Sequence, residues 1–170
     1  SQRDGLTGAS NRMYFDETLR REFNLATQYH LPLTIAIIDL DHFKKVNDTH
    51  GHLAGDSLLV TVVKTVCAQI RQDDTLSRYG GEEFALILPG TTLEASRNLI
   101  ARLKEAITEI AYELDDSCII QITASIGVAA YHEGSTTFNE PLDMIKAADS
   151  ALYAAKHAGR NRIVEWNSLL

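Results

Sequence analysis

The stretch over residues 78–84, with the sequence RYGGEEF, constrains the fold more than any other part of the chain. Its two glycines, Gly80 and Gly81, stand between strand-like flanks, and glycine freely adopts the positive φ that both central positions of a type I′ turn require. We therefore predict a hairpin with a two-residue turn. The next residues, Glu82 and Glu83, are adjacent carboxylates, which repel each other unless a cation lies close by. A divalent metal ion is the obvious candidate.

A second pair of acids stands at the end of a predicted buried strand. Residues 34–40 (TIAIIDL) form a nearly continuous apolar run, which is typical of a strand buried on both faces. Asp39 interrupts this run and Asp41 follows two positions later, so both side chains can point to the same face. Because a strand-end acid and a hairpin acid on adjacent strands can converge on one ion, Asp39 and Glu82 are candidate metal ligands. We expect Asp41 to be a structural partner instead.

Apolar spacing predicts that helices and strands alternate along the chain. Helices are predicted around residues 15–26, 42–47, 58–70, 93–110 and 141–158, and strands over 34–40, 75–79, from the glycine turn to 88, 118–130 and 162–166. The strand over 118–130 bends at Gly127, where a bulge would fit. This order indicates an α+β fold, or α/β sandwich, with one mixed or antiparallel sheet covered by helices.

Composition limits the partners. The chain has 170 residues, 45% of them hydrophobic and 23% charged, which suits one globular domain with a substantial core. With 16 basic and 23 acidic residues, the net charge of −7 argues against nucleic acid as a partner, so a phosphate ligand would need local basic groups or metal ions. No apolar run approaches a membrane span and no leader is visible, so we expect a cytoplasmic domain without membrane contact. Cys67 lies in an apolar helical pattern and is expected to be a buried thiol.

Several motifs, in order and at consistent spacing, resemble those of the GGDEF family of diguanylate cyclases over nearly the whole chain. They are Asp4-Gly5-Leu6-Thr7-Gly8 with Asn11-Arg12; Asp39-x-Asp41-x-Phe43-Lys44-x-x-Asn47-Asp48-x-x-Gly51-His52-x-x-Gly55-Asp56; Gly80-Gly81-Glu82-Glu83-Phe84; Thr123-x-Ser125-Ile126-Gly127-Val128-Ala129; Ala148-Asp149-x-Ala151-Leu152-Tyr153-x-Ala155-Lys156; and Gly159-Arg160-Asn161. The resemblance implies a central, mostly antiparallel sheet of the five-stranded type, wrapped by helices and similar to the nucleotide cyclases and the polymerase palm. It further implies that residues 1–170 form a single catalytic domain, the C-terminal part of a larger signalling protein that could be membrane-anchored.

The implied activity is condensation of two GTP molecules into cyclic di-GMP with release of pyrophosphate. Each domain of a homodimer would hold one GTP, and each 3′-hydroxyl would attack the α-phosphate on the facing domain. Two alternatives stay open: a non-catalytic signalling module that binds GTP or cyclic di-GMP, and another palm-like nucleotidyltransferase or adenylyl cyclase. The hairpin acids and the residues expected to read guanine are both present, which favours the cyclase.

The resemblance places two Mg²⁺ (or Mn²⁺) ions in the active site, held by Asp39, the backbone carbonyl of Leu40 and Glu82. Hard divalent ions with oxygen ligands neutralise the charge that phosphoryl transfer places on phosphates. Glu83 is expected to bind the second ion or to help deprotonate the 3′-hydroxyl, with an ordinary surface glutamate as the alternative. Asp39, Glu82 and Glu83 are therefore the expected catalytic residues.

Two polar residues match the positions that read guanine, Asn47 and Asp56. An aspartate can accept hydrogen bonds from the N1–H and N2 amine of guanine, and an amide adds both donor and acceptor. The alternative for each residue is a helix cap.

The expected phosphate contacts come from basic side chains and from exposed backbone near a helix N-terminus and the glycine pair. They are His42, Phe43, Lys44, Gly80, Gly81, Lys156 and Arg160. For Lys156 and Arg160 the alternative is a basic last turn of a helix, favoured by the helix dipole.

A product-inhibition site for cyclic di-GMP is expected at Arg71-x-x-Asp74, which stands a short distance before the glycine pair as in the family. A guanidinium can grip the guanine edge and phosphates bidentately while the aspartate accepts from the base. Arg102 resembles the secondary arginine of that site. The alternative is an ordinary ion pair at a helix end.

Overall fold

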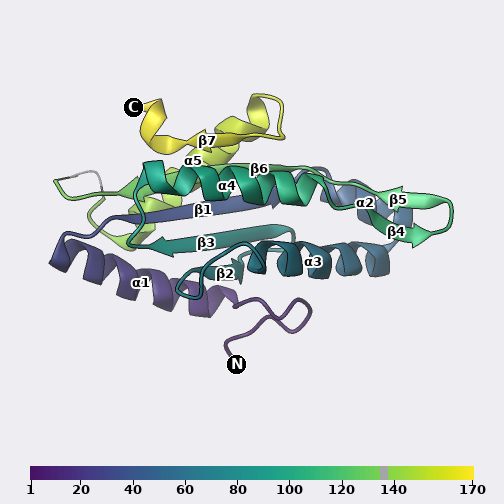
Figure 1. Cartoon of the computed structure of the whole chain (residues 1–170), viewed down its shortest axis with the longest axis horizontal. Helices are drawn as coiled ribbons and strands as arrows, with labels where there is room; N and C mark the ends of the chain where they lie inside the picture. Colours follow the sequence, from purple (N-terminus) through teal and green to yellow (C-terminus); the bar gives the residue numbers. More distant parts are fainter. Residues whose placement is uncertain (135–137) are drawn as a thin grey trace.

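A five-stranded sheet forms the centre of the protein (Figure 1), as a computed structural model that describes residues 1–134 and 138–170 shows. Its strand order is β2-β3-β1-β6-β7, and only the pair β6–β7 is parallel. The strands are β1 (Leu33–Leu40), β2 (Thr75–Arg78), β3 (Glu83–Pro89), β6 (Ala124–Tyr131) and β7 (Ile163–Glu165). The expectation of a mostly antiparallel sheet in an α+β fold is confirmed.

Five α-helices cover the two faces of this sheet. They are α1 (Arg12–Tyr29), α2 (Phe43–His50), α3 (His52–Cys67), α4 (Leu93–Thr108) and α5 (Pro141–His157), followed by the short 3₁₀ helix η1 (Trp166–Leu169). The last residue of α3 corrects one prediction: Val62, Val63 and Val66 form the buried stripe, and Cys67 falls beside it and is exposed. No helix within the described ranges is long and apolar enough to cross a membrane.

The strand predicted over 118–130 is two strands with different partners. Residues 118–120 form β5 (Cys118–Ile120), which pairs with β4 (Tyr112–Asp115) in a separate two-stranded sheet that projects beyond one end of the central sheet (Figure 1). β1 ends at Leu40, opposite Ala124. Residues before Ala124 therefore have no neighbour in the central sheet, which explains why the chain leaves it there.

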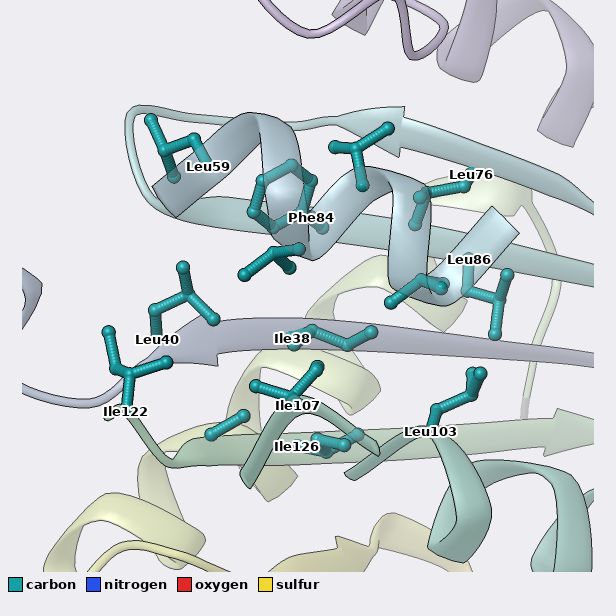
Figure 2. Packing of buried hydrophobic residues seen from close by; sticks show 14 of the residues in the cluster. Ile38, Leu40, Leu59, Leu76, Phe84, Leu86, Leu103, Ile107, Ile122 and Ile126 are labelled. Atoms are coloured by element: carbon teal, nitrogen blue, oxygen red, sulfur yellow. The ribbon is translucent and has the colours of Figure 1, made fainter. Parts of the chain in front are cut away.

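Every residue of β1 is buried, which confirms the strand predicted to be covered on both faces. Because alternate side chains point to opposite faces, Ile35 and Ile37 pack with α1 and α5, whereas Ala36, Ile38 and Leu40 pack with α3 and α4. Figure 2 shows the second of these layers, with side chains from the sheet meeting others from the helices. The sheet thus separates two apolar layers, and the end of β1 is positioned from both sides.

Gly127 allows α5 to lie directly on β6. A Cβ atom at this position would stand 2.1 Å from the backbone oxygen of Ala148 and 2.3 Å from the backbone nitrogen of Leu152. The pairing of β6 with β1 continues through Ile37 and Gly127 without a shift, so the expected bulge is wrong. The glycine serves a close helix–strand approach, which brings the C-terminal half of α5 over the end of the sheet.

The glycine pair lies in a hairpin, but the turn is longer than predicted. Pairing between β2 and β3 ends at Arg78 and Phe84, and neither Gly80 nor Gly81 has a positive φ. The backbone N–H groups of Tyr79 and Gly80 both donate to the carbonyl of Glu83, at 2.8 and 3.1 Å. The two-residue type I′ turn is therefore wrong: the last paired residues are Arg78 and Phe84, and residues 79–83 form a wider loop that is closed by the bonds to the Glu83 carbonyl.

Candidate active site

The ends of β1 and β3 bring the predicted acids together. Asp39 and Glu83 are direct partners across the two strands. Both lie two residues from side chains that face α1 and α5, Ile37 and Ala85, so both carboxylates point to that face. The backbone N–H of Leu40 donates to the carbonyl of Glu82 at 3.3 Å. The structure therefore places Asp39, Leu40, Glu82 and Glu83 at one corner of the sheet.

Helix α5 adds a cation and a further carboxylate to this corner. The Lys156 ammonium forms an ion pair with Asp39, whose side chain is only 10% exposed. Lys156 thus contacts one of the acids, whereas the alternative, a basic last turn favoured by the helix dipole, required no such contact. Asp149 lies about two helical turns earlier on the same face. No site role was predicted for Asp149. The structure shows its place, because the preceding residue, Ala148, packs on Gly127.

The charge in this corner is not balanced by protein groups. Burial, followed by the negative charge of Asp39, raises the pKa of Glu83, and the Lys156 ammonium only partly opposes this. Burial also raises the pKa of Asp149, against the opposing charges of Arg12 and Lys156. A carboxyl with a raised pKa is one whose ionised form lacks stabilisation, which an additional cation would supply.

The donor set fits Mg²⁺, although the described part of the chain contains no group of three or more His, Cys, Asp or Glu side chains arranged to hold a metal ion. Carboxylates and a backbone carbonyl are the oxygen ligands that Mg²⁺ prefers, and water and substrate phosphates usually complete its shell. The Lys156 ammonium lies against Asp39 where a cation is needed. The residues that would hold the ion are Asp39, Leu40 through its carbonyl, Glu82 and Glu83.

The raised pKa of Glu83 leads to a test on stability. A raised carboxyl pKa means that the folded state binds the proton more tightly than the unfolded state, so this group favours folding at low pH and loses that contribution as pH rises through the folded-state pKa. Glu83→Gln should therefore raise the melting temperature at neutral pH, and the difference from wild type should shrink toward about pH 4. Thermal melts in EDTA across this range measure it.

The matched control is Glu113→Gln, at an exposed position of β4. It should change the melting temperature little at any pH in the series. A Glu83→Gln protein less stable than wild type at neutral pH would contradict the unfavourable environment assigned to this carboxylate.

Two arginines hold the hairpin loop from the side of the N-terminus. The Arg78 guanidinium donates to the carbonyl of Gly81 at 2.9 and 3.1 Å and pairs with Asp4 at 3.4 Å. The Arg12 guanidinium lies 3.7 Å from the centre of the Tyr79 ring. These contacts were not predicted, because Asp4 and Arg78 are far apart in sequence and only the fold brings them together.

The predicted guanine readers lie where α2 and α3 pack together. Asn47 is inside α2 and Asp56 inside α3, so neither caps a helix and the capping alternative is wrong. The Asn47 Oδ1 atom is buried and has no hydrogen-bond partner among the described residues. Leaving such an acceptor unsatisfied costs about 1–3 kcal/mol, so packing between the two helices, and not a hydrogen bond, holds this oxygen in place.

Gly55 makes room for the Asn47 side chain, and sequence reasoning gave it no role. A Cβ atom on Gly55 would stand 1.8 Å from Asn47 Oδ1, so only glycine leaves room for that side chain. A glycine inside a helix costs about 1 kcal/mol relative to alanine. A glycine inside the helix, directly before Asp56, was therefore the signal in the sequence that could have indicated a close contact at this position.

Five of the predicted phosphate contacts lie at two helix ends, and the other two, Gly80 and Gly81, lie in the hairpin loop. His42 precedes α2 in a left-handed conformation with φ of 56°, Phe43 is buried, and the side chain of Lys44 is 88% exposed, 3.8 Å from Asp48. Arg160 follows α5, also in a left-handed conformation, with φ of 62°. The amides that begin α2 and the cations that end α5 therefore flank the acid corner.

The predicted inhibitory residues gather at the C-terminal end of α3. The side chain of Asp74 is fully buried and accepts a hydrogen bond from Arg71. The Arg71 side chain is 62% exposed and also donates to Thr91 Oγ1 at 2.7 Å. Arg102 donates to Gln69 at 2.9 Å, from α4. The ion pair named as the alternative is therefore present, and it leaves the Arg71 guanidinium accessible to a ligand.

A cavity of about 530 Å³ borders this site at Asp41 and His42. It lies between α2 and residues 119–123, and its wall includes Lys45, His50 and Gln121. Neither the acid corner nor the guanine readers line it. This cavity therefore lies beside the acid corner and the predicted guanine readers and does not include them.

Comparison with known proteins covers the whole of this site. The family model for "Diguanylate cyclase, GGDEF domain" matches residues 1–162. The chain is 38% identical over 162 residues to the probable diguanylate cyclase DgcC of Escherichia coli K12 (95% of this chain, 42% of that protein) and 41% identical over 161 residues to the diguanylate cyclase DgcP of Pseudomonas aeruginosa (94% and 23%). It therefore spans less than half the length of these curated relatives. The crystal structure of the DgcB GGDEF domain from Caulobacter crescentus in complex with c-di-GMP has a TM-score of 0.90 at 31% identity, covering 98% of this chain and 96% of that one.

Proposed function

The chain belongs to the GGDEF family of diguanylate cyclases, and on this premise we propose that it condenses two GTP molecules into cyclic di-GMP. In each half-reaction the 3′-oxygen of one GTP forms a bond to the α-phosphorus of the other, and the bond to the pyrophosphate leaving group breaks. The proton of the 3′-hydroxyl passes to a base, and Glu83, whose pKa burial and Asp39 raise, suits that role. Two such steps close the ring and release two pyrophosphates.

The observation that carries this proposal is the pairing of Asp39 with Glu83 at the sheet corner, with Glu82 bonded through its backbone to Leu40. Mg²⁺ bound to these oxygens would neutralise the triphosphate and polarise the reacting phosphoryl group. Lys156 and Arg160, at the end of α5, would add charge-assisted hydrogen bonds to the phosphates. Asn47 and Asp56 would read the guanine edge.

The reaction also requires two active sites that face each other, because one domain holds one GTP. We therefore propose that the active form is a homodimer of domains. The domain would act as the C-terminal catalytic unit of a longer cytoplasmic signalling protein. The greater length of the relatives supports only that the protein is longer than this domain.

The test is turnover of GTP with Mg²⁺, followed by chromatography of the nucleotides and an assay for pyrophosphate. Cyclic di-GMP and pyrophosphate should appear in a ratio of about one to two and should vanish with EDTA. ATP should not be consumed. Binding of GTP without turnover would instead identify a non-catalytic signalling module, and equal use of ATP would contradict the role given to Asn47 and Asp56.

We further propose that cyclic di-GMP inhibits this activity by binding at Arg71 and Asp74. The exposed Arg71 guanidinium and the nearby Arg102 would meet its phosphates and guanine edge. Hydrogen bonds to a charged group contribute about 1.5–3 kcal/mol, so Arg71→Ala should raise the product concentration for half-inhibition by roughly 10- to 100-fold. Initial rates measured with added cyclic di-GMP check this.

Arg97→Ala is the matched control for that measurement, because Arg97 also lies in a partly exposed ion pair, with Glu165 at 2.8 Å. It should leave the half-inhibition concentration unchanged. An equal shift for both variants would mean that loss of an ion pair, and not of a ligand contact, is being measured.

A further inference from the structure

Asp41 is a buried carboxylate that joins three separate segments of the chain. It follows β1 directly and is 7% exposed. Its Oδ1 accepts from the hydroxyl of Ser125 at 2.6 Å, and its Oδ2 accepts from the hydroxyl of Thr123 at 2.7 Å and from the backbone N–H of Asn161 at 3.0 Å. Its role as a structural partner is thereby confirmed, and both oxygens are already engaged.

The third of these segments is the loop that carries Arg160. Arg160 and Asn161 are both left-handed, with φ of 62° and 49°. This conformation costs roughly 1–2 kcal/mol for an ordinary L-residue, with asparagine more tolerant. The Arg160 backbone is itself bonded on both sides, because its N–H donates to the Ala155 carbonyl at 3.0 Å and its carbonyl accepts from Arg162 Nε at 3.0 Å. Asn161 is held by the bond from its N–H to Asp41 and by the Lys104 ammonium, which donates to Asn161 Oδ1 at 2.7 Å.

The backbone of Asp41 lies on the other side of the phosphate site. Asp41 stands between Asp39 and the turn at His42 that begins α2, and its own N–H donates to the carbonyl of Thr123 at 2.8 Å. One buried side chain therefore sets the distance between the end of β1 and the loop after α5.

We propose that Asp41 is a positioning residue that holds Arg160 toward the triphosphate of GTP by fixing the backbone of Asn161. This inference rests on the proposed function, which supplies the GTP. It assigns Asp41 to hydrogen bonding and not to metal binding, so the shape of its carboxylate matters and its negative charge does not.

Substitution by asparagine separates these two properties. An asparagine whose oxygen takes the place of Oδ2 can still accept from Asn161 N–H and from Thr123. Its amide group can donate to Ser125, because a hydroxyl rotates to accept. Asp41→Asn should therefore keep the KM for GTP within about threefold of wild type, whereas Asp41→Ala should raise it roughly tenfold, with a smaller change in kcat.

A double-mutant cycle tests whether the effect passes through Arg160. Arg160→Ala should itself raise the KM for GTP by roughly tenfold or more, and Asp41→Ala should add less than about threefold in that background. Lys104→Met, which releases the other contact to Asn161 with little risk to folding, should raise the KM a few-fold alone and not at all beside Arg160→Ala.

The matched control is Asp143→Ala at the opposite end of α5. Asp143 also accepts from two backbone N–H groups, those of Asn139 and Glu140, at 2.9 and 3.2 Å. It should lower the melting temperature and leave the KM for GTP unchanged.

Three results would overturn the inference: additive effects of Asp41→Ala and Arg160→Ala, an Asp41→Asn enzyme as poor as Asp41→Ala, or a loss confined to kcat. Wild-type protein that neither binds nor turns over GTP would instead contradict the proposed function, and the inference would fall with it.

Discussion

Glu82→Gln should lower the kcat for cyclic di-GMP formation by roughly 10³-fold. The substitution keeps the shape of the side chain and removes the negative charge at the loop beside Asp39. Metal ions contribute several kcal/mol of charge stabilisation to phosphoryl transfer, and each ~1.4 kcal/mol corresponds to a factor of ten in rate. Weaker binding of Mg²⁺ should also raise the Mg²⁺ concentration that gives half-maximal activity.

The measurement is a Mg²⁺ titration of GTP turnover for wild type, Glu82→Gln and the exposed control Glu113→Gln. The control should match wild type in both kcat and Mg²⁺ dependence. Retention of activity within about threefold by Glu82→Gln would remove Glu82 from the metal site and leave the acid corner without its proposed function.

Asp56→Ala should lower kcat/KM for GTP by roughly 10- to 100-fold and weaken the preference for GTP over ATP. The N1–H and N2 amine of guanine are donors to this carboxylate, whereas adenine presents an acceptor at N1 and has no N2 amine. Loss of a hydrogen bond to a charged group costs about 1.5–3 kcal/mol. Most of the loss should appear in KM, because the contact is made equally before and during the chemical step.

Gly55→Ala gives an independent view of the same pocket. Its methyl group would displace Asn47, whose Oδ1 lies 1.8 Å from the position of that Cβ, and would also press on Phe43 Cζ at 3.1 Å. It should weaken GTP binding as Asn47→Ala does. Asp116→Ala, in the exposed β4–β5 turn, is the control. If Asp56→Ala leaves the GTP and ATP rates unchanged relative to each other, guanine is read elsewhere.

The sequence was sufficient to predict the order of the helices and of the central strands, because that order follows from local periodicity. It did not predict β4 or the division of residues 118–130 into two strands. The buried run ending in Asp39 was predicted as a strand covered on both faces, and the structure confirms it. The hairpin at residues 78–84 was also predicted correctly, although its turn type was not. Turn geometry depends on where the pairing of β2 with β3 ends, at Arg78 and Phe84, and that is a property of the sheet.

The structure corrected predictions wherever distant segments meet. Gly127 was interpreted as a bulge because nothing in its neighbourhood reveals that α5 lies against it. Cys67 was placed inside because a helical stripe does not show which of two neighbouring positions faces the sheet. Asp149 and Arg78 were not given roles, since their partners stand far away in the chain.

The sequence by itself determined the fold class, the two pairs of acids and the motifs of the family, because these are carried by residue type and short spacing. Only the tertiary structure decided that Lys156 pairs with Asp39, that Gly55 makes room for Asn47, and that Asp41 ties the end of β1 to the loop after α5. The physical reason is that each of these contacts joins side chains on different elements. Their meeting depends on how helices pack on the sheet, which no local pattern of residues records.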